Sequence, residues 1–226
     1  MAKPITISVT GYTEINRDPE RAVLSFAVIH KAAEQTTASS NIVQTSKAVQ
    51  ELLETYAPKL PTGEATSDAA ITHWSMTNMS TSSYQDQIDK TTVFEATTSF
   101  TAKFRDFDKL GSVSSTLSVI PNVSIKSIRW MLTDATISSL VSECRISAAH
   151  NALEKARDYA KAFGYQDVQP YEISDNGYGL PVASSASMMR SRKIMRGVRH
   201  EEQLLLTFRP EEVSMNSSVT VKFNVV

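Results

Sequence analysis

ITISVTGYTEINRDPERAVLSFAVI, residues 5–29, is the stretch that decides the fold of this chain. Apolar and polar residues alternate along its first and last thirds, and a period of two places the apolar side chains on one face of a strand. The stretch therefore predicts two adjacent strands with a turn around residues 16–19. The second strand is also apolar at Val23, Ala27 and Ile29, so both of its faces carry apolar side chains. Such a strand is usually central in a sheet, covered by helices or by a partner surface.

The rest of the chain shows further helical and strand periods. These predict helices at residues 36–56, 106–121 and 134–163, and strands at residues 70–78, 94–104, 123–130, 168–173, 203–208 and 217–226. Residues 80–90 are polar and are expected to form a loop or a hairpin tip. Asp106 is placed to cap the second helix. The order β-β-α-β-β-α-β-α-β-β-β predicts an α+β fold, with a mixed, largely antiparallel sheet packed by two or three helices.

The third predicted helix carries a long apolar stripe. Its members recur at steps of three or four residues, and they are Ile137, Leu140, Cys144, Ala148, Ala152, Ala156, Tyr159 and Phe163. We expect this stripe to be buried, because its small alanines allow the helix to approach a sheet closely. A cysteine in this position most often acts as a small buried hydrophobe.

Three motifs of the chain resemble those of a known family. They are Val9-Thr10-Gly11 followed by Pro19, Glu20 and Ala22, the helix start FRDFDKLGSVSSTL with Arg105, Asp106, Asp108, Lys109 and Leu110, and the alanine-rich helix of residues 134–163. Their order and spacing are similar to the SIMPL-domain family, whose bacterial members include the periplasmic YggE-type proteins. The resemblance covers nearly the whole chain and implies an α+β fold, ring-like homo-oligomers in bacterial relatives and roles in stress protection. The animal relative for which the family is named is a signalling adaptor associated with a kinase.

Length and composition set bounds on domains, partners and compartment. A chain of 226 residues can bury a core without a disulfide or a metal, and we expect one SIMPL-like domain over residues 1–226 with a flexible insertion at residues 174–202. The formal net charge of -1 gives no global reason for a nucleic-acid or membrane partner. A single cysteine, and an opening without the apolar core of a secretory signal, predict a cytoplasmic protein, whereas the bacterial relatives are typically exported.

The sequence contains no arrangement typical of catalysis, cofactor binding or metal binding. The histidines, His30, His73, His150 and His200, have none of the spacings that put two metal ligands on one face. A GxSxG elbow and a glycine-rich phosphate loop are also absent, and Gly177-Tyr-Gly179 is the nearest approach to the latter. We therefore predict no catalytic residue, no cofactor and no metal.

Residues 174–202 differ from the rest of the chain because they show no clear period. They contain MMRSRKIMRGVRH, which gathers Arg190, Arg192, Lys193, Arg196 and Arg199 beside three methionines. Long irregular insertions are usually functional or disordered. Two interpretations stay open: a mobile or self-assembly loop, or a site where guanidinium groups hold an acidic protein surface, a phosphorylated segment, RNA or an anionic lipid.

Two hypotheses of function from different classes follow. The first is a non-enzymatic protein that acts by self-assembly and protein–protein contacts, in stress protection or signalling as the resemblance implies. It predicts a homo-oligomer with a protein partner and without nucleic acid or a membrane span. The second is a small-molecule-binding protein or enzyme, with a pocket between the sheet and residues 174–202 and with Trp74, Trp130 and Tyr178 as apolar walls. Aromatic residues on strands are more often core, which favours the first hypothesis.

Overall fold

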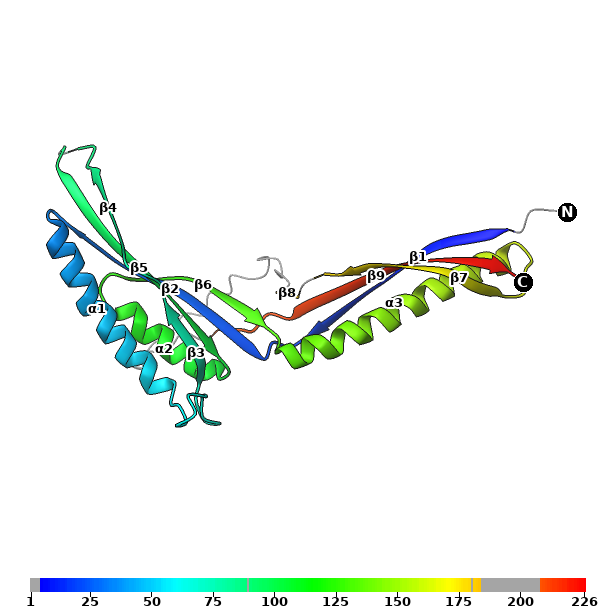
Figure 1. Cartoon of the computed structure of the whole chain (residues 1–226), viewed down its shortest axis with the longest axis horizontal. Coiled ribbons are helices and arrows are strands. Elements are labelled where there is room, and N and C mark those ends of the chain that lie inside the picture. The colour runs from blue at the N-terminus through cyan, green and yellow to red at the C-terminus, as the bar shows by residue number, and fades with distance from the viewer. Residues whose placement is uncertain (1–4, 89, 180, 184–207) are drawn as a thin grey trace, which may run out of the picture. The chain divides into compact units, whose positions relative to one another are not determined.

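The computed structural model describes residues 5–88, 90–179, 181–183 and 208–226. Its elements in chain order are β1 (Thr6–Arg17), β2 (Arg21–Ala32), α1 (Gln35–Tyr56), β3 (Ile71–Met76), β4 (Ser80–Gln85), β5 (Thr92–Phe104), α2 (Phe107–Val119), β6 (Val123–Met131), α3 (Asp134–Ala162), β7 (Val168–Tyr178), β8 (Val182–Ala183) and β9 (Val213–Val225). They form two compact units, each with its own sheet (Figure 1). Unit 1 takes its described residues from Met1–Pro19, Met131–Ser187 and Glu211–Val226, and unit 2 from Glu20–Trp130 and Met188–Pro210.

Unit 1 is an antiparallel sheet with one long helix along it (Figure 1). Its strand order is β1-β9-β7, and β8 also pairs with β9. Every second residue of β9 is buried over most of its length, namely Val213, Met215, Ser217, Val219, Val221 and Phe223. The helix α3 buries every fourth residue, namely Leu140, Cys144, Ala148, Ala152, Ala156 and Ala160. The small side chains of this stripe let α3 lie close to the sheet.

The predicted stripe of α3 is confirmed from Leu140 to Ala156 and is wrong at its end. Ala160 is buried in place of Tyr159 and Phe163, which are 53% and 76% exposed. A step of four residues continued from Leu140 leads to Ala160. Tyr159 and Phe163 each lie one position before a residue of this four-residue series, and one position corresponds to a rotation of roughly 100° around the helix, away from the sheet.

Unit 2 is built around β2. Its strand order is β3-β5-β2-β6. The strand β4 pairs with the first half of β5, whereas β3 pairs with the second half. The rings of Phe26 on β2 and Phe100 on β5 stack with their centroids 5.2 Å apart. Both α1 and α2 pack against these two strands. The prediction that the second strand is central is therefore confirmed.

The start of α2 is fixed by two neighbouring side chains. Asp106 Oδ1 accepts a hydrogen bond from the Lys109 backbone N–H (2.9 Å), which confirms the predicted cap. Arg105 donates from Nη1 to the Ser67 carbonyl (3.1 Å) and from Nη2 to the Thr66 carbonyl (2.7 Å). Both residues therefore have a structural role, because they order the helix start and the loop that precedes β3.

The predicted α+β class with largely antiparallel pairing is confirmed. The strands divide between two sheets, because β1 pairs with β9 while β2 pairs with β5. The two strands of the opening stretch are therefore neighbours in the sequence but belong to different sheets.

Several strands differ from the prediction in their bounds. Residues 80–85 form β4, so that the loop expected over residues 80–90 is shorter, and the bond from Asp86 N to Thr91 O (2.9 Å) closes the hairpin. Pairing with β9 extends β7 past residue 173 to Tyr178. The predicted strand at residues 203–208 lies outside the described residues except for Phe208, which belongs to no strand.

Candidate functional site

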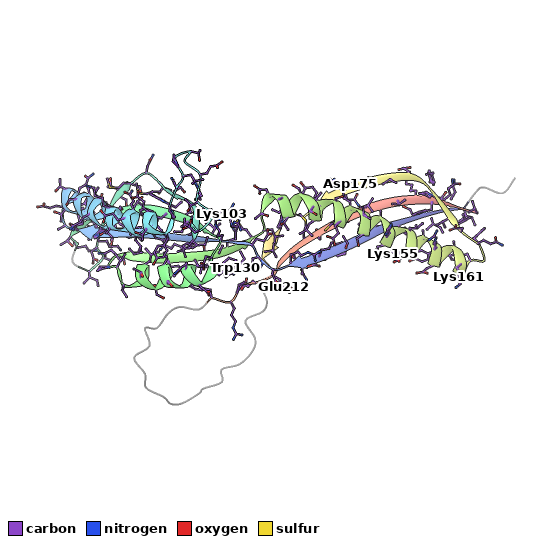
Figure 2. All side chains as sticks on the ribbon, turned by 90° about the horizontal axis from the view of Figure 1, so that it is seen from below. Lys103, Trp130, Lys155, Lys161, Asp175 and Glu212 are labelled. Carbon is purple, nitrogen blue, oxygen red and sulfur yellow. The ribbon has the colours of Figure 1, made fainter. Side chains whose placement is uncertain are left out.

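The predicted anion or partner contacts lie outside the described residues. They are Arg190, Arg192, Lys193, Arg196 and Arg199. The beginning of the predicted insertion is described and is part of β7. It contacts α3, because Arg145 lies 3.5 Å from the Asp175 carboxylate and 5.7 Å from the centre of the Tyr178 ring (Asp175 is labelled in Figure 2). The basic cluster itself stays a prediction.

The described histidines do not converge. His30 on β2 shares a hydrogen bond with the Thr45 hydroxyl of α1 (2.9 Å), and burial lowers the pKa of its imidazole. His73 and His150 are exposed, and His200 lies outside the described residues. Among the residues that the structure describes, no three His, Cys, Asp or Glu side chains are grouped so that they could hold a metal ion.

Cys144 is fully buried on the inner side of α3, as predicted. Its Sγ lies 3.8 Å from the Met215 carbonyl oxygen. Burial raises the pKa of the thiol, the neighbouring Glu143 raises it further, and Arg17 acts in the opposite direction. A protonated, enclosed thiol of this kind packs as a small apolar side chain.

The three aromatic residues of the second hypothesis lie in separate places. Trp130 on β6 is only 6% exposed and packs edge-on against Phe107, with ring centroids 5.0 Å apart (Trp130 is labelled in Figure 2). Trp74 on β3 is half-buried and belongs to unit 2, whereas Tyr178 belongs to unit 1. None of the three lines either of the two apolar pockets described below.

One of these pockets lies in unit 2 and is named the α1 groove. It has a volume of about 180 Å³ and is lined by Ile42, Val43, Ser46, Lys47, Gln50, Met76, Met79 and Thr98. Ile42 is buried, whereas Val43, Met76 and Met79 are each nearly half exposed. Gln50 Nε2 lies 3.2 Å from Met76 Sδ, which connects α1 to the end of β3. A site at the two methionines was not predicted from the sequence. Their spacing across the end of a strand is only a weak signal of a binding site.

The α1 groove adjoins an edge of the unit 2 sheet. Both β3 and β4 pair with β5 on its side away from β2. Between them, Thr77 N donates to the Ser99 carbonyl (2.8 Å), and the Thr98 hydroxyl donates to the Thr77 carbonyl (2.9 Å). These bonds fix the break between the two strands. Met79 directly precedes β4, so the groove opens where this edge strand begins.

The other pocket, named the end pocket, lies in unit 1. It has a volume of about 490 Å³ and is lined by Ile5, Thr6, Ile7, Tyr159, Phe163, Tyr165 and Val225. The backbone ends α3 here: Gly164 has a positive φ of 84°, and Tyr165 N donates to the Ala160 carbonyl (2.9 Å). This turn leaves Phe163 exposed at the rim, beside Tyr159 and the half-exposed Ile5.

A family model matches nearly the whole chain. The family model described as SIMPL, protein of unknown function (DUF541), matches residues 7–223. No curated protein matches this chain. Within the described residues, no helix combines the length and the apolar character that crossing a bilayer requires.

Proposed function

This chain belongs to the SIMPL family, and from that premise we propose that it acts by self-assembly and protein–protein contacts without catalysing a reaction. The surface that we propose for self-assembly is the end pocket of unit 1. Its partner there is a second copy of the same chain.

The observation that carries this proposal is the exposure of three large apolar side chains around one pocket. Phe163 is 76% exposed, Tyr159 53% and Ile5 51%, and all three line the end pocket. Contiguous exposed apolar surface is typical of an interaction site. Complete burial of one such side chain contributes about 1.5–3 kcal/mol. Covering this surface would therefore favour association.

A second copy fits this surface because each chain offers two complementary features. Phe163 stands out at the end of α3, and the apolar depression of about 490 Å³ lies beside it. In a two-fold dimer the same patch meets itself, so that each ring can enter the depression of the other copy.

The wider setting is also part of the proposal. The family resemblance supports a role in stress protection or signalling, and one family model that spans both units supports their action as a single domain. The single free Cys144 is compatible with a reducing compartment, the cytoplasm. The basic cluster of residues 190–199 is proposed as a further contact for an acidic partner.

Native mass spectrometry of the full chain tests the proposal. We expect more than one subunit for the wild type and a shift toward monomer for Phe163→Ser. Ile146→Ser is the matched control, because Ile146 is also exposed on α3 but lines neither pocket. A monomeric wild type, or a Phe163→Ser variant that assembles like the wild type, would contradict self-assembly through the end pocket. A retained small molecule in the same spectrum would favour the second hypothesis.

A further inference from the structure

We propose that unit 2 captures an extended peptide segment of another protein. The segment adds as a strand to the outer edge of β4 and inserts one apolar side chain into the α1 groove. It carries an acidic residue two positions from this anchor, on the same face. The proposal concerns a different surface from the end pocket and does not depend on self-assembly.

The first argument comes from comparing the sheet edges of this chain. Exposed edges carry unpaired backbone N–H and C=O groups, and proteins usually protect them with covering groups, charges, prolines or bulges. The edge strand β1 is covered by α3: Lys155 Nζ donates to the Thr10 carbonyl (2.9 Å), and Asn151 Oδ1 accepts from Tyr12 N (3.1 Å) (Lys155 is labelled in Figure 2).

Two other edges are protected by their own residues. The edge strand β7 contains Pro170, and its register with β9 is interrupted in two places. The edge strand β6 carries Lys126 and Arg129. Proline, irregular register and charge all disfavour the addition of another strand.

The edge formed by β3 and β4 lacks proline and charge, and β4 pairs with β5 without interruption, although the register of β3 with β5 shifts once, between Ile71 and His73. The strands read ITHWSM and STSSYQ, without Lys, Arg, Asp, Glu or Pro, and every residue of β4 is exposed. An exposed, uncharged edge of this kind is a suitable template for an added strand, in which backbone hydrogen bonds provide affinity and neighbouring pockets provide specificity.

The register of β4 identifies the backbone groups that an added strand would bind. Asp86 N donates inward to Thr91 O, which sets the phase of the hairpin. Inward and outward residues alternate along an antiparallel strand. The amide groups of Thr81 and Ser83 therefore point outward.

The second argument is the size and lining of the α1 groove. Its volume of about 180 Å³ is similar to that of an engineered apolar cavity of roughly 150 Å³ that binds benzene. One Leu, Met or Phe side chain is of this size. Methionine side chains such as Met76 and Met79 adapt to different apolar groups. Next to them, Ser46 is only 7% exposed, and its hydroxyl has no hydrogen-bond partner among the described residues.

The third argument is charge. Lys47 is the charged residue of the groove lining, and its side chain is exposed at the rim. Residues two apart in an extended segment lie on the same face. An acidic residue two positions from the apolar anchor can therefore lie beside Lys47.

Panning on the full-length protein with a phage library of random 12-residue peptides tests the proposal. The enriched peptides are expected to carry an apolar residue and an acidic residue two positions apart. Synthetic copies should bind Met79→Glu and Lys47→Glu at least tenfold more weakly than the wild type. Val119→Glu is the control and should bind equally well, because Val119 is an exposed residue of α2 outside the groove.

Amide hydrogen exchange separates strand addition from simple pocket binding. The bound peptide is expected to slow the exchange of the Thr81 and Ser83 amides at least tenfold. Circular dichroism confirms that each variant is folded before binding is compared. The proposal is overturned if no peptide is enriched, if enriched peptides bind Met79→Glu as tightly as the wild type, or if the two amides exchange at unchanged rates.

Discussion

The backbone of Gly11 in β1 lies so close to Ala152 in α3 that a side chain at residue 11 has no room. A Cβ atom there would be 2.7 Å from Ala152 N and 2.9 Å from Ala152 Cβ, and it would overlap the Ala148 carbonyl oxygen. The glycine of the Val9-Thr10-Gly11 motif is thus required by close packing of the strand against the helix.

Gly11→Ala is expected to destabilise unit 1. Inserting one methyl group into a closely packed site typically costs about 1–3 kcal/mol, and the atoms met here are partly backbone, which cannot rotate away. Urea unfolding would measure the loss in the free energy of unfolding. Ser8→Ala, at an exposed position of β1, is the control and should change it little.

The double variant Gly11→Ala/Ala152→Gly makes this prediction sharper. Shortening Ala152 removes its Cβ but leaves the Ala148 carbonyl and the Ala152 backbone in place. We therefore expect little rescue of the free energy of unfolding. Full recovery in the double variant would show that the side chain of Ala152, and not the helix backbone, sets the limit.

The pKa of His30 predicts a dependence of stability on pH. Burial lowers this pKa in the folded protein below the ordinary value of 6.5. Below pH 6.5 the unfolded chain takes up a proton that the folded protein binds less readily. The stability is therefore complete above pH 6.5 and is lost as the pH falls through the lower folded value. Urea unfolding between pH 5 and 8 should show a steeper acid loss for the wild type than for His30→Gln, and equal slopes would contradict the prediction.

Cys144 is expected to be unreactive in the folded protein. Its thiol is buried and its pKa is raised, so that both access and the thiolate fraction are reduced at pH 7. Iodoacetamide labelling followed by mass spectrometry should be at least tenfold slower in buffer than in 8 M urea, a standard denaturing condition. Similar rates under the two conditions would mean that α3 opens readily from its sheet.

The contribution of Arg105 to stability is expected to depend on the geometry of its guanidinium group and not only on its charge. It donates to the Ser67 and Thr66 carbonyls from two different nitrogens, which a lysine cannot reproduce with the same geometry. Arg105→Lys should lower the free energy of unfolding by about 1.5–3 kcal/mol, the range for hydrogen bonds to charged groups. Arg129→Lys, on the exposed side of β6, serves as the control. An effect no larger than that of the control would contradict the assigned role.

Features that depend on local periodicity could be predicted from the sequence. The strand with two apolar faces is β2, which is central in its sheet. Asp106 caps α2, and the alanine stripe of α3 is buried. The pairing of β1 with β9 could not be predicted, because it joins residues as distant as Thr6 and Asn224 and leaves no local signal.

The candidate surfaces could be predicted only in part. Tyr159 and Phe163 were predicted to belong to the buried stripe of the third helix. The predicted stripe allowed steps of either three or four residues, and this placed both side chains on the wrong face. The α1 groove was missed because it combines residues from α1, β5 and the end of β3, and no single segment carries its pattern.

The register of β1 with β9 has a consequence for biosynthesis. Thr6 pairs with Asn224, and the residues of unit 2 between Glu20 and Trp130 are made before the partner strand of β1 exists. On the ribosome, the helices and strands of unit 2 emerge in one continuous stretch, Glu20–Trp130, while β1 still lacks its partner strand β9. The nascent chain therefore passes through a stage in which its earliest strand has an unpaired edge that a chaperone could protect.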